Sequence, residues 1–138
     1  MKVLVIGSGR VGSAVALELK AAGWDVTVID EREEALGRLG ENWTGDFLVG
    51  HGMDIQLLRD AGIEEAYAVV VTTDGDNSNI VIGQMAQKQF NVPSVVVRIL
   101  DPARAAFYTS RGLNVVCPTS SAIATLTEAV RAGEGALR

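Results

Sequence analysis

Short apolar runs alternate with segments of helical periodicity along the whole chain. The runs are rich in β-branched residues and mostly continuous, which is typical of strands in a parallel sheet that are buried on both faces. They cover residues 3–6, 26–29, 47–49, 68–71, 95–97 and 115–116. This alternation predicts an α/β fold, namely a Rossmann-type doubly wound sheet of about six parallel strands with helices on both faces.

The segments between the runs carry helix signals of their own. Val11, Val15 and Leu19 are spaced four residues apart, so they share one face of a first helix that ends near Gly23. Asp and Asp-Pro at helix starts are the expected N-cap and first-turn residues. Further helices are therefore expected after Asp54, over residues 77–90, after Asp101 and from residue 119 or 120 to about 131.

Length and composition limit the chain to one domain. It has 138 residues, of which 48% are hydrophobic, enough for a core that needs no disulfide or metal. We expect residues 1–132 to form the domain and residues 133–138 to form a tail or the start of a linker. The first apolar run is too short for an export signal, and no stretch approaches a membrane span. A cytoplasmic protein is the expectation.

Charge and reactive residues exclude several function classes. A net charge of −5 argues against a nucleic-acid binder that works by general phosphate attraction. The chain has one cysteine and one histidine, Cys117 and His51, with no recognisable Ser/His/Asp arrangement or metal-ligand spacing. Cys117 follows a buried run and is expected to be an inert core thiol. The sequence predicts no catalytic residue and no metal site, and therefore not an enzyme.

The strongest chemical signal is the glycine loop Gly7-Ser8-Gly9-Arg10-Val11-Gly12 between the first strand and the first helix. It is a G-x-G-x-x-G pattern in the strand–turn–helix context that makes this motif informative. Gly7 would allow the tight turn, Gly9 would let the backbone approach a pyrophosphate, and Gly12 would let helix and strand pack closely. The helix N-terminus would offer N–H groups and a positive dipole end to phosphates.

Two charged residues extend this site. Asp30 follows the second strand, 18 residues beyond Gly12, where an acid accepts hydrogen bonds from ribose hydroxyls and repels a 2′-phosphate. A helix cap is its alternative role, and the two are compatible. Arg10 is a cation at the unfavourable end of a helix dipole, which favours a phosphate contact over a solvated role. We therefore predict binding of an adenine nucleotide or NAD(H).

In combination, these motifs resemble the TrkA N-terminal domain family, also called RCK (regulator of potassium conductance) domains. The resemblance rests on the glycine loop, Asp30, Asn77, Asn79 and residues 50–54, 57–63, 66–74, 98–102 and 111–118. It implies a cytoplasmic regulatory subunit at the inner face of the membrane that gates a potassium channel or transporter. It also implies bound ATP, ADP, AMP or NAD(H), a membrane-embedded partner, and a homodimer that can assemble into an octameric ring.

The resemblance also implies roles for single residues. Thr73 and Asp74 would line the crevice after the fourth strand, and Arg98 would contact a phosphate, with a salt bridge to Asp101 or Asp74 as its alternative role. His51 stands where the family often has an acid that reads adenine, and it can stack or hydrogen-bond. The expected cofactor-binding residues are Gly7, Ser8, Gly9, Arg10, Val11, Gly12, Asp30, Glu31, Arg32, His51, Gly52, Met53, Thr72, Thr73, Asp74, Asn77 and Arg98.

The remaining expectations concern the interface and the alternatives. The family's dimer is built mainly from the last strands and helices, so Ala105, Phe107, Tyr108 and Ile123 are candidates for it, with core packing as the alternative for each. The coenzyme-binding domain of an NAD-dependent oxidoreductase is an alternative function, and an NADH/NAD redox sensor is another. Many relatives carry a C-terminal ligand-binding domain after the helix that is expected here to end at about residue 131.

Overall fold

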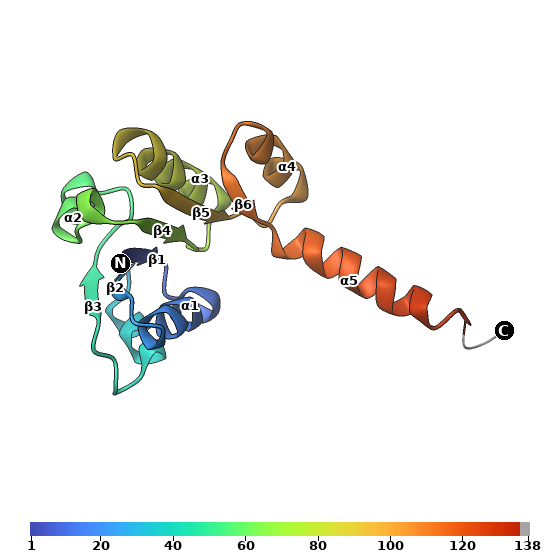
Figure 1. Cartoon of the computed structure of the whole chain (residues 1–138), viewed down its shortest axis with the longest axis horizontal. Coiled ribbons are helices and arrows are strands. Elements are labelled where there is room, and N and C mark those ends of the chain that lie inside the picture. Colours follow the sequence, from blue (N-terminus) through green and yellow to red (C-terminus); the bar gives the residue numbers. More distant parts are fainter. Residues whose placement is uncertain (136–138) are drawn as a thin grey trace.

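The computed structural model describes residues 1–135 and contains one sheet of six parallel strands (Figure 1). The strands are β1 (Lys2–Ile6), β2 (Asp25–Asp30), β3 (Asp46–Val49), β4 (Ala68–Val71), β5 (Ser94–Arg98) and β6 (Asn114–Val116). Their order in the sheet is β3-β2-β1-β4-β5-β6, and every neighbouring pair is parallel. The predicted fold class is confirmed, and the strand order reverses between β1 and β4, where such sheets bind ligands.

The helices begin and end close to their predicted positions. They are α1 (Arg10–Ala21), α2 (Ile55–Asp60), α3 (Asp76–Gln84), α4 (Pro102–Ser110) and α5 (Pro118–Ala132), and α3 continues as the π-helical turn η3 (Met85–Gln89). Asp54 caps α2 by accepting hydrogen bonds from the backbone N–H groups of Gln56 and Leu57, and Asp101 caps α4. The link from β2 to β3 holds only the 3₁₀ helix η1 (Glu33–Leu39), and η2 (Ile63–Glu65) precedes β4.

Two apolar layers cover opposite faces of the sheet, because side chains alternate along each strand. On β1, Val3 and Val5 join the layer under α1 and η1, which also contains Ala16 and Leu39. Leu4 and Ile6 point the other way, into the layer under α2, α3 and α4. The central strands therefore fulfil the prediction of burial on both faces, whereas the edge strands β3 and β6 are only partly buried.

Helix α5 does not cover the sheet. It extends away from the rest of the molecule (Figure 1), and none of its residues is buried. Its apolar side chains Ile123, Leu126 and Val130 are 57%, 67% and 74% exposed. The helices that cover the two faces of the sheet are therefore among those before α5, because the chain leaves the sheet edge at Pro118.

Three further observations concern the last residues, the length of the helices and the one cysteine. Residues 136–138 of the predicted tail lie outside the described residues. Within residues 1–135, no helix combines the length and the apolar character that are needed to cross a membrane. Cys117 is only half-buried and lies at the start of α5, where its Sγ accepts a hydrogen bond from Ser120 Oγ at 3.3 Å. It packs against the apolar layer under α2, α3 and α4 without being fully buried, so the predicted core thiol lies at the margin of the core.

Candidate functional site

An open pocket of about 360 Å³ lies at the carboxyl ends of the central strands, at the point where the strand order reverses. Four loops surround it: the glycine loop after β1, and the segments that follow β2, β3 and β4. Ile6, Ile29 and Ile82 supply apolar side chains to its lining. The other lining residues are Gly7, Ser8, Gly9, Asp30, Glu31, Arg32, Glu34, Ala35, Arg38, Gly50, His51, Gly52, Thr72, Thr73, Asp74, Gly75 and Ser78.

Close backbone packing holds the glycine loop in place. Gly7 has a φ of +101°, and a Cβ there would lie 2.5 Å from the Thr72 carbonyl oxygen. A Cβ on Gly12 would overlap with the Gly7 carbonyl oxygen, so α1 approaches the end of β1 closely at this residue. Gly9 differs from both, because the space next to its Cα contains no protein atom within 4 Å of a Cβ position. Gly9 also lines the pocket and is the N-cap of α1, so its open side is available to a ligand.

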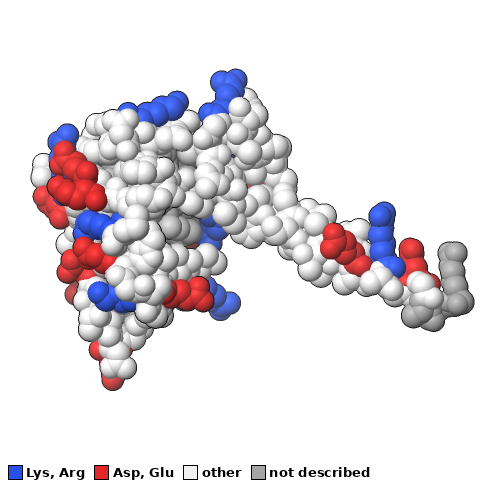
Figure 2. Space-filling view, viewed as in Figure 1, with Lys and Arg blue, Asp and Glu red and all other residues white. Residues whose placement is uncertain are grey.

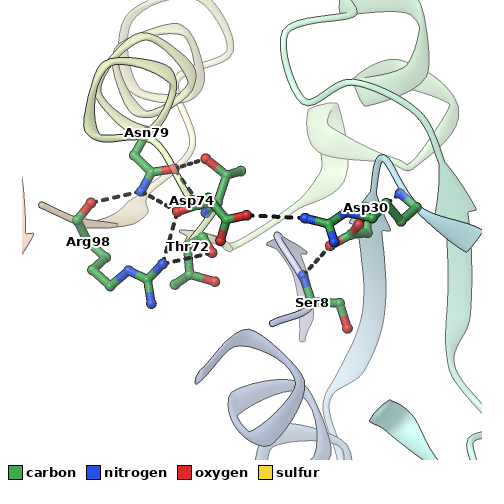
Figure 3. A network of polar contacts seen from close by, with 8 residues as sticks. Ser8, Asp30, Thr72, Asp74, Asn79 and Arg98 are labelled. Atoms are coloured by element: carbon green, nitrogen blue, oxygen red, sulfur yellow. Dashed lines mark hydrogen bonds and ion pairs between the residues drawn. The ribbon is translucent and has the colours of Figure 1, made fainter. Parts of the chain in front are cut away.

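Asp30 joins the glycine loop to the end of β2. Its Oδ2 accepts a hydrogen bond from the Ser8 backbone N–H at 2.7 Å (Figure 3). Its Oδ1 accepts one from the Arg32 backbone N–H at 2.9 Å, as in an Asx turn, and the expected role as a helix cap is not found because the N-cap of η1 is Arg32. Carboxylate oxygens have further lone pairs, so these two bonds leave Asp30 able to accept from a ribose hydroxyl.

An ion pair and a histidine–carboxylate contact cross the mouth of the pocket. Arg32 Nη2 lies 3.4 Å from Asp74 Oδ2, and the pair links the residues after β2 to those after β4. His51 Nε2 lies 3.0 Å from Glu31 Oε1 and links the residues after β3 to those after β2. The Met53 backbone N–H donates to His51 Nδ1 at 3.2 Å, so the proton of the neutral ring is on Nε2. Both ring nitrogens of this histidine thus have partners at the rim.

The wall after β4 depends on a buried amide that the predicted site does not include. Asn79 Oδ1 accepts from the Thr73 backbone N–H at 3.0 Å and from the Thr73 hydroxyl. Its Nδ2 donates to the carbonyl oxygens of Thr73 and Arg98, at 3.1 and 2.9 Å (Figure 3). Asn79 is 1% exposed. The sequence feature that could have indicated its role is a polar residue next to Ile80, on the face of the helix that packs against the sheet.

Arg98 has different partners from those expected. Its Nη2 donates to the carbonyl oxygens of Thr72 and Thr73, at 3.4 and 2.9 Å. The alternative of a salt bridge to Asp101 or Asp74 is wrong, because Asp74 pairs with Arg32 and Asp101 caps α4. Strand β5 lies beyond β4 from the pocket, which places Arg98 beside the pocket wall instead of in the lining.

The remaining predicted site residues divide into two groups. Ser8, Gly52 and Thr72 line the pocket with the residues already described, whereas Arg10, Val11, Gly12, Met53 and Asn77 do not. Arg10 and Val11 are exposed on the first turn of α1, and Asn77 Oδ1 accepts from Arg104 Nη1 at 2.7 Å. The sequence prediction missed Glu34, Ala35 and Arg38, which enter the lining because η1 lies next to the glycine loop, where Ser8 Oγ donates to the Ala35 carbonyl oxygen at 3.4 Å.

Comparison with known proteins gives a consistent result. The family model described as the TrkA-N domain matches residues 3–119. The Trk system potassium uptake protein TrkA of Streptomyces coelicolor is 43% identical over 116 residues, covering 84% of this chain and 52% of that protein. The protein of the same name from Mycobacterium tuberculosis H37Rv is 34% identical over 132 residues, covering 93% and 58%. The chain spans about half the length of these two relatives.

Solved structures show the same fold. The GsuK RCK domain superposes with a TM-score of 0.81 at 25% identity, over 98% of this chain and 29% of that chain. GsuK has also been solved bound to ADP and, as the channel, bound to NAD, each with a TM-score of 0.80 at 25% identity. These two matches cover 96% and 98% of this chain, and 34% and 24% of the GsuK chains.

Proposed function

This chain belongs to the TrkA-N domain family, and from that premise we propose that it is the nucleotide-binding regulatory domain of a potassium-uptake system. The observation that carries the proposal is the pocket at the strand-order reversal, which combines the glycine loop, the N-terminus of α1 and Asp30. Its ligand is an adenine nucleotide (ATP, ADP or AMP) or NAD(H). The relatives' name supports potassium uptake as the process, and ADP and NAD bound to GsuK support the ligand class.

The strand order suggests how the ligand lies in the pocket. Its phosphates meet the open side of Gly9 and the N-terminus of α1, above the carboxyl end of β1. The ribose meets Asp30 at the end of β2, the next strand in the sheet. The base then extends toward β3, between the η1 residues Ala35 and Arg38 and the rim at His51. The acid at position 30 disfavours a 2′-phosphate, so NADP(H) is not the expected dinucleotide.

Regulation requires a second arrangement of the protein for the ligand to favour. A nucleotide shifts such an equilibrium only through its different affinities for the two arrangements. We expect the two to be arrangements of a homodimer, with a membrane-embedded potassium channel or transporter as the partner that responds. This assignment makes the domain a regulator at the inner face of the membrane, not a catalyst.

Helix α5 and the neighbouring α4 supply the surface for the proposed dimer. The charged atoms of α5 gather at its outer end, and the part next to the body carries none (Figure 2). Phe107 on α4 is 48% exposed and borders a groove between α3 and α4. Of the interface candidates, Phe107 and Ile123 are exposed and Tyr108 is half-buried, whereas Ala105 is buried in the core and does not reach the surface.

The test of nucleotide binding is a glycine variant that leaves the free protein intact. Gly9→Ala places a methyl group in open space at an ordinary φ of −77°, so the fold is expected to keep its stability. The same methyl group stands where the pyrophosphate must approach, and we expect affinity for ADP and NADH to fall at least about tenfold, because the backbone contacts are blocked. Isothermal titration calorimetry measures the dissociation constants.

Gly37→Ala is the matched control. Gly37 lies in η1, also has open space at its Cβ position, and does not line the pocket. Its variant is expected to bind both ligands like the wild type. Wild-type protein that binds neither ADP nor NADH would contradict the proposed function, and equal affinities of the Gly9→Ala and wild-type proteins would contradict the placement of the phosphates.

A further inference from the structure

The Arg32–Asp74 ion pair lies across the path of the ligand's phosphates. Arg32 follows β2 and Asp74 follows β4, and β1 lies between these two strands in the sheet. The 3.4 Å contact therefore passes over the carboxyl end of β1, where the glycine loop begins (Figure 3). A chain of phosphates that starts at that loop and continues toward β4 therefore meets Arg32 and then Asp74.

The pair is easily exchanged for a ligand contact. The side chains of Arg32 and Asp74 are 74% and 90% exposed, and solvated ion pairs of this kind contribute only about 0–1 kcal/mol. A phosphate offers the guanidinium charge-assisted, bidentate hydrogen bonds that are stronger. The backbone N–H of Arg32 is bonded to Asp30, so the side chain starts beside the proposed ribose site and reaches the phosphates from there.

The direction of the phosphate chain determines which groups it meets. With the ribose at β2 and the first phosphate above β1, each further phosphate extends toward β4. The second phosphate comes under Arg32, and a third approaches the carboxylate of Asp74. Of the lining residues after β4, Thr72, Thr73 and Ser78 are neutral and none is a cation. Arg98, the nearby cation, directs its Nη2 to two carbonyl oxygens of that wall.

The charges of the residues that line the pocket also disfavour a third phosphate. The lining contains four acids, Asp30, Glu31, Glu34 and Asp74, against the two arginines 32 and 38. A triphosphate with four negative charges is therefore the least favoured nucleotide. We infer that Arg32 and Asp74 make this site selective for ligands with two linked phosphates, a nucleoside diphosphate or a dinucleotide, over a nucleoside triphosphate. The inference rests on the proposed nucleotide binding.

The experiment compares AMP, ADP and ATP by calorimetry in the presence of EDTA, so that no divalent cation neutralises the phosphates. Wild-type protein is expected to bind ADP about tenfold more tightly than ATP, a ratio of the size expected for like charges a few ångströms apart at a solvated surface. Asp74→Ala is expected to raise ATP affinity by about five- to tenfold and to change ADP affinity by less than about threefold. Arg32→Gln is expected to weaken the binding of ADP about tenfold and the binding of AMP much less.

The matched control is Asp46→Ala, which makes the same change of charge at the amino end of β3, the opposite end of the sheet. It is expected to leave the ratio of ADP to ATP affinity unchanged. The inference is overturned if wild-type protein binds ATP as tightly as ADP, or if the Asp74 and Asp46 variants raise ATP affinity equally. In both cases the proposed function stands. Protein that binds none of the three nucleotides overturns the proposed function itself, and the inference with it.

Discussion

At the scale of single residues, the side chain of Thr72 connects the ends of two strands. Its hydroxyl donates to the Gly7 carbonyl oxygen at 3.1 Å, and the residue is 7% exposed. Gly7 belongs to the glycine loop after β1, and Thr72 follows β4 directly. This bond therefore joins the two sides of the strand-order reversal, and it satisfies a carbonyl group that little water can reach.

Replacing Thr72 with valine removes the hydroxyl but keeps the shape of the side chain. We expect Thr72→Val to lower the free energy of unfolding by about 1–3 kcal/mol, because the buried Gly7 carbonyl loses its partner. Urea denaturation followed by circular dichroism measures the change. Thr109→Val, at an exposed position of α4, is the control and is expected to stay within about 0.5 kcal/mol of wild type. A Thr72 variant as stable as its control would rule out this role.

At the scale of elements, the first turns of α3 connect the pocket wall to the start of α4. Asp76 accepts hydrogen bonds from the backbone N–H groups of Leu100 and Asp101, at 2.8 and 3.0 Å. Asn79, one turn later, bonds Thr73 on one side and the Arg98 carbonyl on the other. The loop after β4 and the loop after β5 are therefore attached to the same helix.

The stability of this junction is expected to depend on Asn79. Asn79→Ala leaves the Thr73 N–H and the Arg98 carbonyl without their amide partner, and each buried group of this kind costs about 1–3 kcal/mol. We expect the free energy of unfolding to fall by about 3 kcal/mol in total, which is the sum of two costs within that range. Chemical denaturation measures the change. Asn77→Ala, in the same turn but exposed, is expected to lose less than about 1 kcal/mol. Equal losses in the two variants would contradict the role of the buried amide.

At the scale of the whole molecule, the prominent feature is α5, none of whose residues is buried against the rest of residues 1–135. A helix of 15 residues is marginally stable alone in water, and its apolar stripe at Ile123, Leu126 and Val130 follows helical spacing. Helices in proteins obtain most of their stability by packing such a stripe. A second copy of the chain, as proposed, would supply the missing surface.

A charge in the stripe is therefore expected to separate the copies. Leu126→Glu places a carboxylate where the proposed dimer is apolar, and we expect the protein to sediment as a monomer, since burying an unpaired charge is costly. Thr125→Glu puts the same charge away from the stripe and is expected to leave the dimer intact. Analytical ultracentrifugation distinguishes the two masses. A monomeric wild-type protein, or a dimer that tolerates Leu126→Glu as well as it tolerates Thr125→Glu, would contradict the interface.

Local pattern was sufficient for most of the fold and for the centre of the candidate site. The central strands were predictable because strands buried on both faces read as continuous apolar runs, and the partly buried edge strands β3 and β6 carry shorter apolar runs. Asp54 and Asp101 cap helices through their own backbone neighbours. The glycine loop and Asp30 could also be predicted from the sequence, since the fold places the ends of β1 and β2 side by side. In each case the relevant partners are close in sequence or fixed by strand adjacency.

What the sequence determined by itself is therefore the alternation of strands and helices, the glycine turn and the acid beside it. Only the tertiary structure decided that Asp74 pairs with Arg32, that Arg98 bonds two carbonyl oxygens, and that α5 leaves the sheet. The physical reason is distance along the chain. Arg32 and Asp74 are 42 residues apart, and Arg98 and Thr72 are 26 apart, so their contacts exist only once the strand order has brought their loops together.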